Sequence, residues 1–335
     1  MSRLIRTFAT LAALGLAAGC SSAPGVDEAS VARDTSQRTT PAGQSPFWVD
    51  PSSSAAQQIQ MWQRQGRTKD AQFLKRIADQ PAALWPAGDD PAGTIRAATA
   101  AAAQEKRTAL FVAYNIPHRD CGQHSAGGAY DADNYRDWIG KFADALGDSK
   151  ALVVLEPDAV AHMVDGCTPG EYHEEREQLL AEAIVRLKRQ PHTKVYLDAG
   201  NPAWIEDPWK LVEPLKRAGV EQADGFSLNV SNFQTDTATK KYGVRLSQDL
   251  GGKHFVVDTS RNGRGPLRGD RSDAWCNPPG RALGTRPTTD TGEPALDAYL
   301  WIKRPGESDG QCRGGPAAGQ WWPDYALGLA RNSRA

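Results

Sequence analysis

The 335-residue sequence lacks a strong net charge, because 39 lysines and arginines nearly balance 40 aspartates and glutamates. Without a basic excess there is little electrostatic attraction for nucleic acid or an anionic membrane surface. Histidine is also scarce, with six residues and no two at metal-ligand spacing. No glycine-rich phosphate-binding motif follows any apolar run. We therefore expect no metal, no other cofactor and no nucleic-acid partner.

Long apolar runs are also lacking, except at the N-terminus. Arg3 and Arg6 precede an apolar run that ends in Ala17-Ala-Gly-Cys20. This pattern predicts an export signal over residues 1–20, similar to a lipoprotein signal whose lipid anchor would be Cys20. Position 17 is more often leucine in such signals, so an ordinary signal peptide cleaved nearby is the alternative. Residues 21–45, rich in Ser, Thr, Pro and Gly, are expected to be a flexible tether to a single catalytic domain, 46–335.

Cysteine is sparse too, and four remain once Cys20 is set aside. An even number in an exported chain predicts two disulfides, for which three pairings are possible. We favour the sequential pairing, Cys121 with Cys167 and Cys276 with Cys312. Each bond would then tie two neighbouring turns together beside a candidate carboxylate.

Short apolar runs alternate with helical patterns along the rest of the chain. Strands are expected at 108–114, 151–155, 194–197, 225–228, 255–257 and 296–302. Helices are expected at 52–65, 68–79, 95–106, 135–146, 175–189, 209–218 and 320–332. This alternation predicts an α/β fold with a parallel sheet, and the number of units favours a closed barrel. Residues 259–295 carry no regular pattern, and so long a loop is usually functional.

Acidic residues follow most of the predicted strands. In Glu156-Pro157-Asp158, the proline ends a fully apolar strand and places Asp158 beside buried surface. Burial would raise the pKa of this carboxyl and keep it protonated, as a general acid requires. Taken alone, Asp158 fits a helix N-cap better than a catalytic acid. Aspartates at several strand ends would share one rim, however, where β/α barrels place their active sites.

Six blocks of sequence resemble glycoside hydrolase family 6, the cellulases that include endoglucanases and cellobiohydrolases. They are Tyr114-Asn-Ile-Pro-His-Arg-Asp-Cys121-Gly, Val154-Leu-Glu-Pro-Asp158, Tyr196-Leu-Asp198-Ala-Gly, Leu228-Asn-Val-Ser-Asn232, Trp275-Cys276-Asn-Pro-Pro-Gly-Arg-Ala-Leu-Gly284 and Trp301-Ile-Lys303-Arg-Pro-Gly-Glu307-Ser-Asp309-Gly. They occur in the family's order from about Trp48 to Asn332. The resemblance implies a distorted β/α barrel of about seven parallel strands, with the active site at the strand C-terminal ends.

The resemblance also implies hydrolysis of β-1,4-glucosidic bonds with inversion. Asp158 matches the catalytic acid, Asp120 the aspartate that tunes the acid's pKa, and Asp309 the residue proposed as base or sugar ligand. A water relay is the alternative to Asp309 as base. The expected substrate-binding residues are Tyr114, Arg119, Ser125, Asp198, Trp204, Asn232, Trp275, Lys303, Glu307 and Trp85. Two departures are Asn201, where the family usually has histidine, and the water-positioning serine, which is Ser125 unless Ala126 occupies that place.

The short catalytic region favours an open cleft and internal cleavage, because cellobiohydrolases of the family carry longer loops that roof the cleft. The expected activity is therefore an endo-β-1,4-glucanase acting as a monomer at the cell surface on cellulose or a related β-glucan. An exo-acting cellobiohydrolase is one alternative. A non-catalytic lipoprotein that binds β-glucan is another, although it would not require Asp158, Asp120 and Asp309 together. A metal held by the acids is a third, and their places on separate strands disfavour it.

Overall fold

The computed structural model describes residues 45–269 and 273–333, which all belong to one compact unit. Cys20, the predicted signal peptide and nearly all of the predicted tether lie outside the described residues. Among the described residues, no helix is both long and apolar enough to traverse a bilayer.

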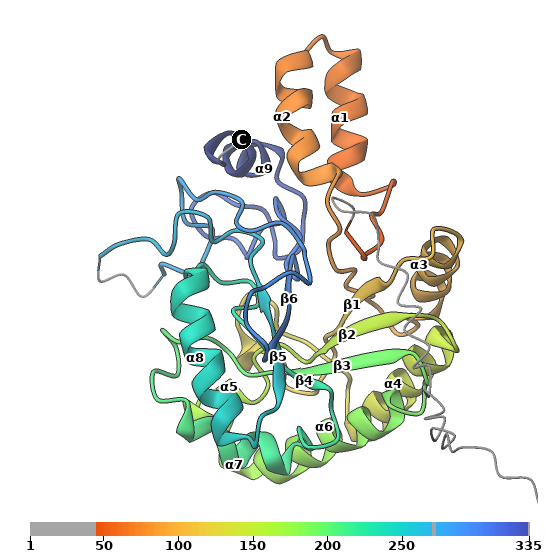
Figure 1. Cartoon of the computed structure of the whole chain (residues 1–335), viewed down its shortest axis with the longest axis vertical. Coiled ribbons are helices and arrows are strands. Elements are labelled where there is room, and N and C mark those ends of the chain that lie inside the picture. The colour runs from red at the N-terminus through yellow and green to blue at the C-terminus, as the bar shows by residue number, and fades with distance from the viewer. Residues whose placement is uncertain (1–44, 270–272, 334–335) are drawn as a thin grey trace, which may run out of the picture. The chain divides into compact units, whose positions relative to one another are not determined.

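The unit is built on six parallel strands that are paired in chain order (Figure 1). Nearly all of their residues are buried, because helices cover one face of the sheet and the other face lines the barrel interior. Burial on both faces explains why the strands are continuous apolar runs. The strands are β1 (Ala109–Ala113), β2 (Ala151–Leu155), β3 (Thr193–Asp198), β4 (Gly225–Leu228), β5 (His254–Asp258) and β6 (Leu296–Leu300).

Helices follow most strands, as the alternating pattern predicted. α4 and α6 pack beside each other on the outer face of the sheet, whereas α1, α2 and α9 form a separate apolar cluster (Figure 1). The α-helices are α1 (Ser54–Arg64), α2 (Thr68–Ala78), α3 (Ala92–Gln104), α4 (Ala132–Leu146), α5 (Ala161–Val164), α6 (His173–Leu187), α7 (Trp209–Arg217), α8 (Asp236–Asp249) and α9 (Pro323–Asn332). Two short 3-10 helices are η1 (Asp120–Gly122) and η2 (Gly170–Tyr172).

The sequence did not predict α8, whose polar composition and internal Gly243 are poor helix signals. The structure gives the reason for this glycine. A Cβ at position 243 would lie 2.4 Å from Cε2 of Phe255, which is fully buried on β5. The missing side chain therefore allows α8 to approach the sheet closely, and this contact cannot be read from the local pattern.

A single bridge spans the gap between β6 and β1, where a further strand would complete the expected set of about seven. The amide of Ala83 donates to the carbonyl of Trp301 at 2.9 Å. The neighbouring Leu84 donates to Leu110 at 2.9 Å and accepts from Val112 at 2.8 Å. The distorted β/α barrel is thus confirmed, with six strands in the described residues and the isolated bridge from Leu84 to Phe111 beside β1. Within 259–295, the described residues form no helix or strand, as predicted.

Candidate active site

A cleft of about 530 Å³ opens where the strands end at their C-termini. Most of the predicted site residues line it, although they come from segments far apart in the chain. These are Trp85, Tyr114, Asp120, Ser125, Asp158, Trp204, Asn232, Trp275, Lys303 and Asp309. Arg119, Asp198 and Glu307 are not among the lining residues.

Asp158 follows β2 in a left-handed backbone conformation, with φ of 72°. Its N–H donates to Oδ2 of Asp198 at 2.9 Å, and Ser227 donates through Oγ to Oδ1 of the same carboxylate at 2.9 Å. Strained backbone of this kind persists only where surrounding contacts hold it. Asp198 is buried and supplies such a contact. It therefore holds the backbone of Asp158 in place and does not line the cleft.

The electrostatic setting of Asp158 suits a proton donor. Burial raises its pKa well above the usual value, and the nearby carboxylates of Asp198, Asp120 and Asp165 raise it further. Both causes disfavour the charged form of an acid. Burial also raises the pKa of Asp198, to about 6. The sequence had anticipated burial and Asp120 as causes, but not the charges at positions 198 and 165.

Arg119 holds the loop that carries Asp120 through hydrogen bonds to its backbone. The guanidinium donates to the carbonyls of Ser125 at 2.8 Å and Tyr114 at 2.5 Å, and it lies over the Tyr114 ring at 4.5 Å. Asp120 itself accepts the N–H of Ser125 at 2.6 Å. Arg119 therefore shapes this wall of the cleft without lining it. The predicted disulfide between Cys121 and Cys167 is confirmed, and it ties the loop to the segment after α5.

Glu156 is a buried carboxyl to which the sequence assigned no role, although it stands beside Asp158 in the same motif. It accepts the N–H groups of Asn115 and Ile116 at 2.9 to 3.0 Å. Burial raises its pKa to about 7. Arg176, also buried, donates to the carbonyls of Pro117 and His118 at 3.0 Å. Together the two side chains hold the backbone that leads from β1 to Asp120.

Asp309 lies on the opposite wall and is tied to cations. Its Oδ2 accepts from Nη1 of Arg261 at 2.8 Å and from the N–H of Asn277 at 2.9 Å. Its Oδ1 lies 3.8 Å from Nζ of Lys303. Sequence reasoning missed Arg261, which is fully buried with its guanidinium 4.4 Å above the Phe233 ring. Its one sequence signal was its place just after β5.

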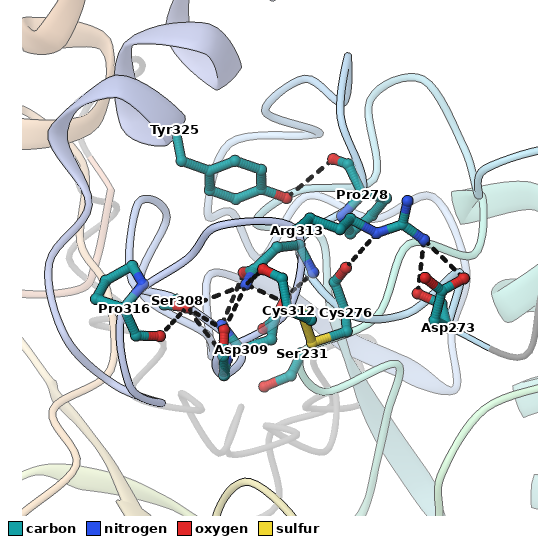
Figure 2. The surroundings of a disulfide bond; sticks show 12 residues. Ser231, Asp273, Cys276, Pro278, Ser308, Asp309, Cys312, Arg313, Pro316 and Tyr325 are labelled. Atoms are coloured by element: carbon teal, nitrogen blue, oxygen red, sulfur yellow. Dashed lines mark hydrogen bonds and ion pairs between the residues drawn. A yellow bond between two sulfur atoms is a disulfide. The ribbon is translucent and has the colours of Figure 1, made fainter.

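The second disulfide, between Cys276 and Cys312, supports the same wall (Figure 2). This pairing was also predicted and is confirmed. Arg313 lies next to it and donates to the carbonyls of Cys276 at 2.9 Å and Asp273 at 3.0 Å. The bond thus joins the loop that carries Trp275 to the loop that carries Asp309.

Glu307 faces a separate small groove rather than the cleft. Its carboxylate lies 2.7 Å from Nε of Arg304, and Trp321 also lines this groove. The resemblance implied that Glu307 is a sugar-hydroxyl ligand, and the structure places it in this neighbouring groove.

Aromatic rings line the cleft in several places. The Trp85 N–H donates to the carbonyl of Ile302 at 2.9 Å, and its ring meets Tyr114 edge-on at 5.4 Å. The Trp204 N–H donates to Asp165 at 2.8 Å. Trp275 is 39% exposed. Aromatic faces beside hydrogen-bonding groups suit a ligand that has flat apolar faces and polar edges, such as a pyranose.

One group of described side chains has atoms close enough to hold a metal ion, namely Cys121, His162 and Cys167. Its two sulfurs are joined in a disulfide and provide no thiolate. This group therefore lacks the donors that a metal site of cysteine and histidine needs.

Comparison with known proteins decides the family. The model of glycosyl hydrolases family 6 matches residues 42–333. The chain belongs to this family. It is 42% identical over 300 residues to endoglucanase A of Cellulomonas fimi, covering 88% of this chain and 63% of that protein. It is 43% identical over 291 residues to endoglucanase 1 of Streptomyces halstedii, covering 84% and 87%. The chain therefore spans less than two thirds of the first of these relatives.

A solved structure agrees. The endoglucanase Cel6 from Mycobacterium tuberculosis, in complex with a thio-linked methyl-cellobiosyl cellobioside, superposes with a TM-score of 0.79 at 43% identity. The match covers 87% of this chain and 98% of that one.

Two departures from the family 6 pattern can now be located. Asn201 stands where the family usually has histidine, and it lines the cleft while its Oδ1 accepts the N–H of Ala203 at 3.1 Å. Ser125 lines the cleft, whereas its neighbour Ala126 does not. Ser125 therefore remains the candidate for the water-positioning serine.

Proposed function

We propose that this family 6 protein is an inverting endo-β-1,4-glucanase that hydrolyses internal bonds of cellulose or a related β-glucan. The observation that carries the proposal is Asp158, a partly exposed carboxyl in an aromatic-lined cleft whose surroundings raise its pKa. An acid whose pKa is raised stays protonated to higher pH and can donate to the oxygen of a glycosidic leaving group.

The proposed reaction breaks one bond and forms another. Asp158 gives its proton to the glycosidic oxygen as the bond from that oxygen to the anomeric carbon breaks. A water attacks the same carbon from the opposite face and loses its proton to a base. Asp309 lines the cleft, and its Oδ2 already accepts two hydrogen bonds. We assign Oδ1 to hold that water or a sugar hydroxyl, and Asp120 to keep Asp158 protonated.

Internal attack is supported by the bacterial relatives. Those at 42% and 43% identity are named endoglucanases, whereas a fungal protein named probable 1,4-β-D-glucan cellobiohydrolase C is 28% identical. The short catalytic region points the same way. The exo-acting alternative uses the same catalytic acid and differs in how far the loops cover the glucan in the cleft.

The decisive experiment combines product stereochemistry with product length. Carboxymethylcellulose and cellohexaose are digested while NMR follows the anomers and viscometry follows chain length. We expect fresh α-anomer and a rapid fall in viscosity. Asp158→Asn should lower turnover by about 10²–10⁴-fold, because the amide cannot donate the proton, while oligosaccharide binding persists.

Three outcomes would contradict parts of this proposal. Fresh β-anomer would exclude inversion. Cellobiose released with viscosity unchanged would indicate exo attack. Wild-type binding without any hydrolysis would indicate a β-glucan-binding protein rather than an enzyme.

We also propose that the chain is exported and anchored by a lipid at Cys20. The support is the leader-like sequence and the two disulfides, which persist in oxidising compartments. Cys20→Ala should release the protein from a membrane fraction into the medium. If the wild-type protein is already in the medium, the anchor is excluded.

A further inference from the structure

Asp165 links the Trp204 ring to the segment that carries the proposed acid. It directly follows α5, seven residues after Asp158. Its Oδ2 accepts the indole N–H of Trp204 at 2.8 Å. Its Oδ1 accepts the N–H of Cys167 at 2.8 Å, and Cys167 is covalently joined to the Asp120 loop. One carboxylate therefore connects Trp204 to the acid-bearing wall of the cleft.

We propose that Asp165 is a positioning residue that holds the Trp204 indole at the angle needed to stack against a pyranose ring of the substrate. This inference rests on the proposed function, because it assumes that a β-glucan chain occupies the cleft. In this role Asp165 acts on the substrate through Trp204, which is separate from the effect of its charge on the pKa of Asp158.

The other contacts of Trp204 limit its position but leave its tilt open. Gly200 lies behind the ring, where a Cβ would stand 3.4 Å from Cε3 of Trp204. His162 meets the ring edge-on at 4.9 Å with an interplanar angle of 68°. The contact with Gly200 has no preferred direction and the edge-on contact with His162 only a weak one, whereas the bond to Asp165 is directional and involves a charge. Charge-assisted bonds are stronger than neutral ones, and solvent weakens this one because Asp165 is exposed.

The position of Trp204 makes this bond useful. The side chain is only partly buried and lines the cleft. A half-exposed ring that must become ordered when sugar binds weakens the affinity, whereas a ring already held in place avoids that entropy loss. Trp85 is also held through its N–H, but by the backbone carbonyl of Ile302. Of these two acceptors, the backbone carbonyl cannot be removed by a side-chain substitution, whereas the Asp165 carboxylate can.

The test is a double-mutant cycle in the Asp158→Asn background. Turnover is suppressed there, and the charge of Asp165 can no longer act on the acid's proton. Calorimetry measures the Kd of cellohexaose for this chain with Asp165→Ala, with Trp204→Phe and with both. Asp165→Ala should weaken binding about tenfold. In the Trp204→Phe chain, which lacks the indole N–H, the same substitution should change the Kd by less than about twofold.

Two further variants separate position from charge. Asp165→Asn keeps an oxygen that can accept the indole N–H, so its Kd should stay within about threefold of the parent. Asp148→Ala removes an exposed carboxylate at the opposite end of β2 and should leave the Kd unchanged. If Asp165→Ala does not fold, Asp165→Ser serves the same test, since its short side chain still accepts from Cys167 but cannot reach the indole.

Equal weakening by Asp165→Ala with and without the indole N–H would overturn the inference, as would no weakening at all. A parent Asp158→Asn chain that does not bind cellohexaose, together with a wild-type chain that does not cleave it, would overturn the proposed function as well. If the Asp158→Asn chain binds cellohexaose with the same Kd with and without the Asp165 carboxylate, only this inference would be overturned.

Discussion

Arg261 and Asp309 form a buried ion pair at the wall of the cleft, with side chains that are 0% and 5% exposed and a nitrogen–oxygen distance of 2.8 Å. The same guanidinium donates to the carbonyl of Ser231 at 2.5 Å. Arg261 thereby joins the ends of β4 and β5 to the loop that carries Asp309. Arg261 therefore fixes the positions of the segments that form this wall of the cleft.

Removing the cation should destabilise the protein. Arg261→Met leaves the Asp309 carboxylate buried with Lys303 at 3.8 Å as its remaining cation. Breaking one side of a buried pair typically lowers the free energy of unfolding by about 3–5 kcal/mol. Urea unfolding measures the loss, and adding Asp309→Asn to Arg261→Met should restore much of it. A double variant as unstable as the single one would show that the unpaired charge is not the cause.

The pH profile should report the carboxylates around Asp158. The protonated acid is the active form, so kcat/KM should fall as the pH rises through its raised pKa. Asp120→Asn removes one of the negative charges that raise this pKa while keeping an oxygen to accept the Ser125 N–H. We therefore expect the basic limb of kcat/KM against pH to move to lower pH. An unmoved basic limb would mean that Asp120 does not act on the acid's proton.

The raised pKa of Asp158 also predicts a pH-dependent loss of stability. Its folded pKa lies above the ordinary value of about 3.9, so between the two the unfolded chain binds fewer protons than the folded one. The free energy of unfolding then falls as the pH rises through this window. Asp158→Asn should raise the Tm at pH 7 and change it little at pH 3, below both pKa values. A Tm difference that is the same at both pH values would contradict this origin.

Gly310 should tolerate alanine less well than Gly314. Both have positive φ, 151° and 80°, so both variants share the backbone strain. Only at position 310 would a Cβ clash, lying 2.4 Å from Cγ of His124, whereas nothing lies within 4 Å of one at 314. His124 is next to Ser125, so Gly310→Ala should lower kcat/KM as well as the Tm. Equal losses in both variants would show that His124 simply moves aside.

The strand runs and their terminal acids made most of the site predictable. Asp158 could be placed because an unbroken apolar run followed by proline marks the end of a buried parallel strand. Asp120 and Asp309 followed from the family 6 blocks, and the structure places both in the cleft with Asp158. The helix α8 was missed because Gly243 is a helix-breaking signal locally, and its packing against Phe255 joins segments twelve residues apart.

The supporting residues could not be read from the chain. Arg261 meets Asp309 across 48 positions, and Glu156 meets Asn115 across 41. Neither partner is marked by any local period or spacing. Glu307 was assigned to sugar binding by the family resemblance, yet its side chain lines another groove, which no local pattern indicates.

The sequence by itself determined the α/β barrel pattern, the family and the acids at the strand ends, because these depend on hydrophobic runs and local motifs. Only the tertiary structure decided which further carboxylates raise the pKa of Asp158, which carboxylate is paired with a cation and which tryptophan is held by a charge. Burial and electrostatic interactions depend on distances between side chains, and folding sets those distances between residues that are far apart in the chain.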